Sequence, residues 1–206
     1  MRIESLTAHL FEAGAPFVAQ ELEHPTVRAL MQGSLTDVQA RYWLEQDYLY
    51  LLDEIRVLAR LAWQAPPRHR TDLIDLAWNV IHEEMPKHIT MSLRFGAQLD
   101  RARMGPATTA YTNWLLDAAA DYGIGMVALL SGLWGYSRLG QRMSVPTEVR
   151  FRLWVESYQD PAFPALARRY ADMVDEVPID ARLANATFIE GMRHALAFWD
   201  IPQAAS

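Results

Sequence analysis

Proline and glycine residues divide this sequence of 206 residues into stretches of helical length, and the positions of these helix breakers limit its fold more than any other feature. Between the breaks, apolar residues recur at helical spacing, and no alternation of apolar and polar residues is long enough to indicate a β-strand. Pro66-Pro67 prevents one stretch from continuing, and Gly140 stops another. The sequence therefore predicts an all-α fold.

Capping signals and these breaks together place the helices. Thr36-Asp37-Val38-Gln39 has the capping-box pattern, in which the Thr hydroxyl takes an N–H at the helix start and the Gln reaches back. Pro86 removes one backbone hydrogen bond, so we expect it to kink a long helix near His82. Gly123-Ile124-Gly125 is expected to separate two helices. The predicted helices run up to about residue 23 and over about 25–33, 37–63, 70–100, 106–122, 126–139, 146–160, 162–173 and 180–199. Because no repeat or long linker interrupts them, residues 1–206 are predicted to form a single domain.

Composition excludes several classes of protein. A hydrophobic fraction of 51% and seven Trp favour a packed globule, and a formal charge of −6 without a basic cluster argues against nucleic-acid binding. No apolar run is long enough to span a bilayer, and the opening residues lack the apolar core of a signal peptide. We therefore expect a cytoplasmic protein with neither membrane nor nucleic acid as partner. With no Cys, there is no disulfide, thiolate metal site or cysteine nucleophile.

One carboxylate, Asp47, interrupts an aromatic and aliphatic run. On a helix, Trp43, Asp47, Tyr50 and Leu51 share a face that points into the core, so Asp47 is at least partly desolvated. A buried carboxylate is costly unless a hydrogen bond or an opposite charge compensates it. Asp47 is therefore either a structural residue satisfied by a neighbour, or the floor of a pocket for a polar, nitrogenous ligand.

Two acid–imidazole pairs have helical spacing. Glu84 and His88 are four residues apart, as are Glu190 and His194. The spacing of the first pair is compatible with two metal ligands or a proton relay. It is equally compatible with a buried acid–imidazole pair beside a helix kink. The second pair is compatible with part of an iron site in a helical bundle, or with a solvent-exposed face of the last helix.

Tyrosines with neighbouring tryptophans form a further group. Phenol hydroxyls on an aromatic wall suit a flat heteroaromatic ligand, although each of these residues is also compatible with core packing. The group comprises Tyr111, Tyr136 and Tyr158, with Trp114, Trp134 and Trp154.

Several short stretches occur in an order that is similar to a known family. They cover residues 24–201, and the two most specific are the Gln46-Asp47 run with its following tyrosine and the closing Phe-Trp. The stretches are His24-Pro25, Tyr42 to Leu51, Glu84-Met85 with His88, Ala110-Tyr111-Thr112, Trp134-Gly135-Tyr136, and Phe198-Trp199. The chain resembles the TenA family, the thiaminase II type of aminopyrimidine hydrolase.

This resemblance implies a heme-oxygenase-like fold, an all-α helical bundle around a central pocket, and a homo-oligomer, either a dimer or a tetramer. It implies a small heterocyclic ligand, an aminopyrimidine hydrogen-bonded by Asp47, and no cofactor or bound metal. The residues expected to line the ligand site are Asp47, Tyr50, Tyr111, Tyr136 and Tyr158.

The catalytic half of the family pattern does not carry over. The family's nucleophilic Cys corresponds to Gly132, and its C-terminal catalytic Glu corresponds to Ala195. Ser131 is adjacent, but one helical step of about 100° turns it elsewhere. Three functions remain: a hydrolase of an aminopyrimidine with displaced catalytic groups, a binding or regulatory protein without chemistry, and an iron-dependent oxygenase. For the hydrolase, Glu84, His88 and Glu190 are the candidate acid–base residues, and for the oxygenase these three and His194 are the candidate ligands.

Overall fold

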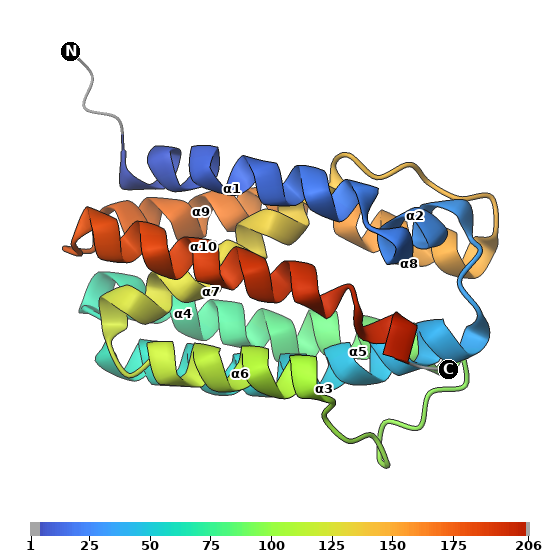
Figure 1. The fold of residues 1–206 in the computed structure, drawn as a ribbon. Coiled ribbons are helices and arrows are strands. Elements are labelled where there is room, and N and C mark those ends of the chain that lie inside the picture. Colours follow the sequence, from blue (N-terminus) through green and yellow to red (C-terminus); the bar gives the residue numbers. More distant parts are fainter. Residues whose placement is uncertain (1–4, 205–206) are drawn as a thin grey trace.

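A computed structural model describes residues 5–204, and these residues form helices with no strand among them (Figure 1). Residues 1–4, which enter the expectation about a signal peptide, lie outside the described part. The α-helices are α1 (Leu6–Glu23), α2 (Pro25–Gln32), α3 (Asp37–Gln64), α4 (Pro67–Asn79), α5 (Met85–Leu93), α6 (Pro106–Ala118), α7 (Tyr122–Gly140), α8 (Val149–Gln159), α9 (Ala162–Asp175) and α10 (Ala181–Phe198). A π-helical turn, Val80–Glu84, joins α4 to α5, and a 3-10 turn, Ile201–Ala204, follows α10.

Local chemistry sets the start of α3, the helix that carries Asp47. The hydroxyl of Thr36 accepts from the N–H of Gln39 at 3.2 Å, and the Gln39 side-chain oxygen accepts from the N–H of Thr36 at 3.1 Å. The predicted capping box is thus confirmed. Gly33, with φ of 67°, ends α2 in the left-handed conformation that glycine adopts without strain.

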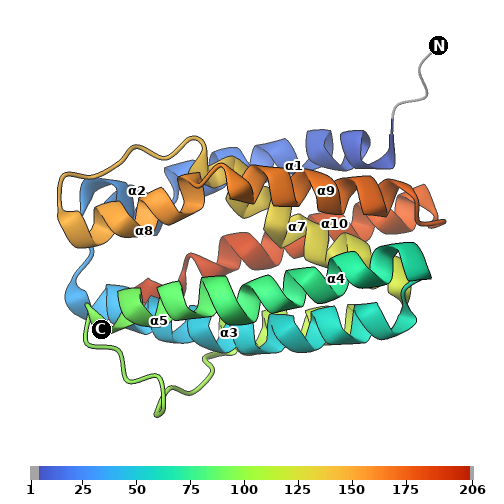
Figure 2. The ribbon, with the colours of Figure 1, turned by 180° about the vertical axis from the view of Figure 1, so that it is seen from behind.

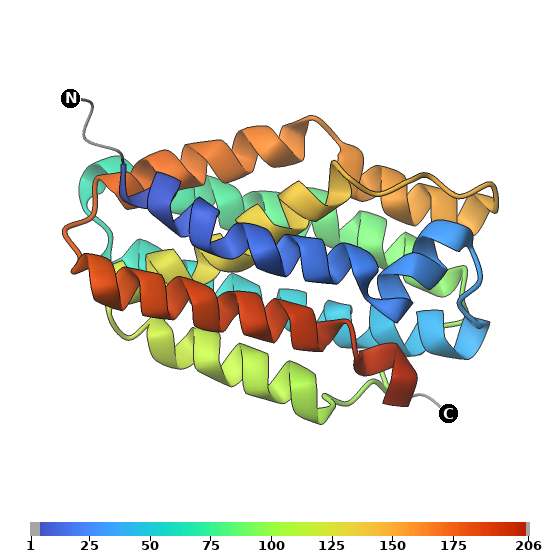
Figure 3. The same ribbon diagram turned by 45° about the horizontal axis from the view of Figure 1, so that its top comes forward.

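The bundle is organised around α7, whose residues are buried on almost every side. Helices α1 and α10 lie side by side and run in the same direction (Figures 1 and 3). Seen from behind, α3, α4 and α5 form one wall and α8 and α9 the other, with α7 and α10 behind them (Figure 2). This arrangement makes the inward faces of α3, α5, α7 and α8 converge.

The long helix predicted over residues 70–100 differs from the observed structure in two ways. The long helix ends at Leu93, not near residue 100, and the disturbance expected near His82 is a π-helical turn rather than a simple kink. The N–H of Met85 bonds to the carbonyl of Val80, five residues back, which widens the helix just before the ring of Pro86.

Gly123 and Gly125 lie inside the first turn of α7 and do not separate it from the preceding helix. A Cβ on Gly125 would lie 2.7 Å from both Ala119 Cα and Leu61 Cδ2. The glycine therefore permits close packing rather than a break. The following helix, α8, begins at Val149 rather than at residue 146.

In the described part of the chain, no helix combines the length and hydropathy needed to cross a membrane.

Candidate functional site: a carboxylate wall facing tyrosines

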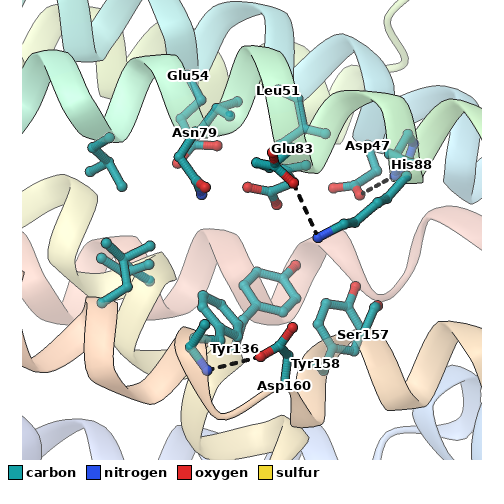
Figure 4. Close-up of a pocket in the computed structure, with 18 of the residues that line it drawn as sticks. Asp47, Leu51, Glu54, Asn79, Glu83, His88, Tyr136, Ser157, Tyr158 and Asp160 are labelled. Carbon is teal, nitrogen blue, oxygen red and sulfur yellow. Dashed lines mark hydrogen bonds and ion pairs between the residues drawn. The ribbon is translucent and has the colours of Figure 1, made fainter.

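A cavity of about 900 Å³ lies between the wall formed by α3, α4 and α5 and the wall formed by α8 and α9. Asp47, Glu54, Asn79 and Glu83 project from one side, and Tyr136 and Tyr158 face them from the other (Figure 4). Carboxylates and phenols thus meet across a space large enough for a small organic molecule.

Helix α3 places Asp47 in this cavity. Trp43 and Leu51, one turn to either side, are buried in the core, and the Asp47 side chain is 21% exposed. Burial raises the pKa of Asp47 to about 7. A carboxyl that ordinarily ionises near pH 4 is therefore about half protonated at neutral pH.

His88 is the polar neighbour of Asp47. Its Nδ1 lies 3.3 Å from Asp47 Oδ2, and its Nε2 lies 2.9 Å from the carbonyl oxygen of Leu44. Because a carbonyl can only accept, Nε2 carries a hydrogen, and Nδ1 of the neutral ring is an acceptor. Burial lowers the pKa of His88, which favours that neutral ring. The contact with Asp47 is therefore attractive when one proton lies between the carboxyl and Nδ1.

Glu84 ends the π-helical turn and lines the cavity. Its side chain is exposed to the open space of the cavity but crowded by protein on the other sides. This crowding and the nearby Asp47 carboxylate raise its pKa. Glu84 and His88 do not contact each other as an ion pair, since the imidazole bonds to Leu44 and Asp47 instead.

Glu54 also lines the cavity, and the sequence reasoning missed it. Burial raises the pKa of Glu54 well above its ordinary value, and the carboxylates of Glu84 and Asp47 raise it further. The signal was present in the sequence, because Glu54 lies seven residues after Asp47 and four after Tyr50 on the inward face of α3.

The predicted tyrosines divide into two groups. Tyr50, Tyr136 and Tyr158 line the cavity, with the rings of Tyr136 and Tyr158 stacked at 5.9 Å. Tyr111 lies behind Tyr50, with the ring centroids 5.1 Å apart, and its hydroxyl is buried. Burial raises the pKa of all four phenols, so they are uncharged at neutral pH.

Gly132, which the family resemblance aligns with the nucleophile, lines the cavity. Ser131 points away, since it is fully buried and its hydroxyl donates to the Ala128 carbonyl at 2.6 Å. The expectation that Ser131 faces elsewhere is thus confirmed. Ala195, on α10, is completely buried and offers no polar atom.

Glu190 and His194 lie away from this cavity. Glu190 is half-exposed and pairs with Arg193 at 2.8 Å, and His194 stacks on Tyr111 with the ring centroids 5.3 Å apart. Across residues 5–204, no three His, Asp or Glu side chains gather in a way that could hold a metal ion. The described residues therefore give no support to an iron site built from the two acid–imidazole pairs.

Comparison with known sequences gives a match to the family model described as TENA/THI-4/PQQC, over residues 14–201. The chain belongs to this family. It is 26% identical over 182 residues to the aminopyrimidine aminohydrolase of Halalkalibacterium halodurans, with 84% of this chain and 81% of that protein aligned. It is 28% identical over 204 residues to the thiamine biosynthesis multifunctional protein ThiED of Corynebacterium efficiens, covering 94% of this chain but only 28% of that longer protein.

Solved structures share the fold. A TenA homologue from P. horikoshii superimposes with a TM-score of 0.91 at 22% identity, over 98% of this chain and all of that one. A domain with a heme-oxygenase-like fold from Shewanella denitrificans gives a TM-score of 0.76 at 14% identity, over 98% of this chain and 93% of that one. The prediction of an all-α, heme-oxygenase-like bundle is therefore confirmed.

Proposed function

We propose that this TENA/THI-4/PQQC family member binds an aminopyrimidine or a related small heterocycle of thiamin metabolism in the cavity between α3 and α8. The observation that supports this most is the Asp47–His88 pair, at 3.3 Å, facing Tyr136 and Tyr158. A carboxyl with a pKa near 7 can accept from a ring amino group or donate to a ring nitrogen. The stacked tyrosines supply an aromatic surface for the ring.

The same cavity holds groups suited to hydrolysis of an aminomethyl substituent. In that reaction the carbon–nitrogen bond breaks, water supplies the new hydroxyl oxygen, and ammonia leaves. Burial and the carboxylates of Glu84 and Asp47 raise the pKa of Glu54, and burial and Asp47 raise the pKa of Glu84, so this pair of carboxyls retains a proton at neutral pH. One carboxyl can protonate the leaving nitrogen while the other takes a proton from water. Glu190 lies outside this scheme because it does not line the cavity.

A second candidate function is binding without turnover. Gly132 and Ala195 occupy the positions where the family resemblance expects a nucleophile and an acid, and neither can act as one. The cavity, the Asp47–His88 pair and the tyrosines would serve a ligand-binding or regulatory role equally well.

Calorimetric titration with hydroxymethyl- and aminomethyl-aminopyrimidine tests the proposal. We expect micromolar binding to the wild-type protein and a loss of about tenfold or more in Asp47→Asn, because a charged hydrogen-bond partner is removed. Glu45→Gln is the matched control, since Glu45 lies on the same helix but bonds the N–H of Gln98 outside the cavity. Absence of binding to both ligands would refute the proposal, and ammonia release from the aminomethyl compound would separate enzyme from binder.

We also propose that the protein is a cytoplasmic homo-oligomer, a dimer or a tetramer. Light scattering on the purified chain tests the assembly, and a monomer at all concentrations would refute it.

A further inference from the structure

The rings of Tyr136 and Tyr158 form part of one wall of the cavity, although they come from different helices (Figure 4). They stack with their centroids 5.9 Å apart and an interplanar angle of 25°. Tyr136 lies within α7, but Tyr158 is the next-to-last residue of α8, which ends at Gln159. The last turn of a helix is the part that its own hydrogen bonds hold least. The Tyr158 ring therefore depends on contacts from outside the end of α8 for its place in the wall.

Gly140 provides the first of these contacts. It is buried, and it ends α7 one helical turn after Tyr136. A Cβ on Gly140 would lie 2.5 Å from the carbonyl oxygen of Tyr158 and 2.6 Å from its Cβ. Ordinary carbon–carbon contacts begin at about 3.5 Å, so no side chain fits between the two residues. Because the φ of Gly140 is not positive, the glycine is required for space and not for a special backbone conformation.

Gln159 provides the second contact. Its Nε2 donates to the carbonyl oxygen of Gly140 at 3.1 Å and to that of Met143 at 2.8 Å. Carbonyls at the C-terminal end of a helix lack the donors that the next helical turn would supply, and this amide takes the place of such donors at the end of α7. The residue that follows Tyr158 thus ties the end of α8 to the end of α7.

Trp154 contacts the other end of the Tyr158 side chain. Its Nε1 donates to the Tyr158 hydroxyl oxygen at 3.4 Å. Trp154 is itself 1% exposed and packs on Trp43, with the ring centroids 4.9 Å apart, so the core holds it in place. The backbone of Tyr158 is therefore held at α7 and its hydroxyl at the core, which leaves the ring little freedom to shift.

We propose that Gly140 and Gln159 are positioning residues that hold the Tyr158 ring in the cavity wall. In this way they set the span between that ring and the carboxyl of Asp47, which a small heterocycle has to fit. The inference rests on the proposed function. Binding groups have to be held within about 0.5 Å of their productive positions, and a Cβ on Gly140 would displace Tyr158 by more than that. Neither positioning residue lines the cavity, so each acts on the ligand through Tyr158.

A double-mutant cycle on ligand affinity tests this inference. Hydroxymethyl-aminopyrimidine is titrated calorimetrically into wild-type protein, Gly140→Ala, Tyr158→Ala and the double variant. We expect each single variant to bind about tenfold more weakly, the effect of losing one aromatic contact. In the Tyr158→Ala background, Gly140→Ala should weaken binding by less than about twofold, because the ring through which it acts is gone. Independent effects that multiply to about a hundredfold in the double variant would overturn the inference.

Gln159→Leu is a second test if Gly140→Ala folds poorly, since it keeps the side-chain volume and removes the donor. It should weaken binding several-fold in wild-type protein and not in Tyr158→Ala.

Gly135→Ala and Gln141→Ala are the matched controls and should bind as wild type does. Gly135 adjoins the flexible end of Met192, and the Gln141 amide donates to Ser137 of its own helix. Wild-type affinity in both Gly140→Ala and Gln159→Leu would overturn the inference and leave the proposed function standing. Failure of wild-type protein to bind the compound would overturn both.

Discussion

His88 contacts Asp47 through the one ring nitrogen that the backbone leaves free: Nε2 bonds the Leu44 carbonyl at 2.9 Å, and Nδ1 faces Asp47 Oδ2 at 3.3 Å. One proton serves both side chains. We expect carbon-13 and nitrogen-15 NMR to show the Asp47 carboxyl and the His88 ring changing together in a transition near pH 7. In Asp47→Asn, His88 should stay neutral to below its ordinary pKa, because burial disfavours the imidazolium. Two separate transitions at ordinary values for Asp and His would contradict a shared proton.

A cysteine placed at position 132 is expected not to act as a nucleophile without further change. Its Cβ would lie 2.8 Å from the Tyr111 hydroxyl, so Gly132→Cys should destabilise the fold by about 1–3 kcal/mol, as overpacking does. The double variant Gly132→Cys/Tyr111→Phe should recover part of this loss, because the clashing oxygen is gone. Urea denaturation of the wild type, the two single variants and the double variant measures the coupling. Strictly additive effects would show that Tyr111 is not the obstacle.

Glu21, a residue of α1 that is 1% exposed, should make the protein less stable as pH rises. Burial raises its pKa to about 8, and one carboxylate oxygen has no hydrogen-bond partner. A group whose pKa is higher in the folded state contributes stability below its unfolded pKa, near 4.5, and this is lost as pH rises toward 8. We therefore expect Glu21→Gln to be more stable than wild type at about pH 8 by a few kcal/mol, and much less so at about pH 5.

Thermal or urea denaturation across this pH range measures the Glu21 effect. Glu23→Gln is the control, since Glu23 is largely exposed and pairs with Arg28 at 3.1 Å. A stability difference between Glu21→Gln and wild type that is the same at every pH would show that Glu21 is not held protonated.

Gly125→Ala should destabilise the junction of α7 with α3 by about 1–3 kcal/mol. The added Cβ would lie 2.7 Å from the backbone Cα of Ala119, which cannot move aside independently of the chain. Gly135→Ala, in the same helix, should cost less than about 1 kcal/mol, because its nearest neighbour is the flexible end of Met192 at 3.2 Å. Comparison of the two unfolding free energies checks this, and similar values would contradict the packing argument.

Helical spacing predicted much of the fold and the carboxylate side of the cavity. It placed Asp47 on an inward face, identified Glu84 beside a proline, and recovered the capping box at Thr36. It failed where packing overrides local propensity: Gly125 looks like a helix breaker but is a close-packing residue inside α7.

Positions within the site depend on helix rotation, which one sequence does not define well. Glu190 and Glu84 have the same spacing to a histidine, yet Glu190 turns to Arg193 and solvent. Tyr111 and Tyr50 are both tyrosines of the expected ligand site, yet Tyr111 lies behind Tyr50 and does not line the cavity. Glu54 was overlooked because it lies one helical turn beyond Tyr50, outside the aromatic run that surrounds Asp47.

The π-helical turn Val80–Glu84 amounts to one extra residue in what would otherwise be a continuous helix from Pro67 to Leu93. The wide turn takes up that residue locally, so the helix before it and the helix after it keep nearly the rotation they would have in an unbroken helix. Asn79 and the acidic residues of α4 therefore face the cavity while His88 holds its place against Leu44. Loss of one codon at this turn would close it into regular helix and displace Glu84, and α4 would still face the cavity.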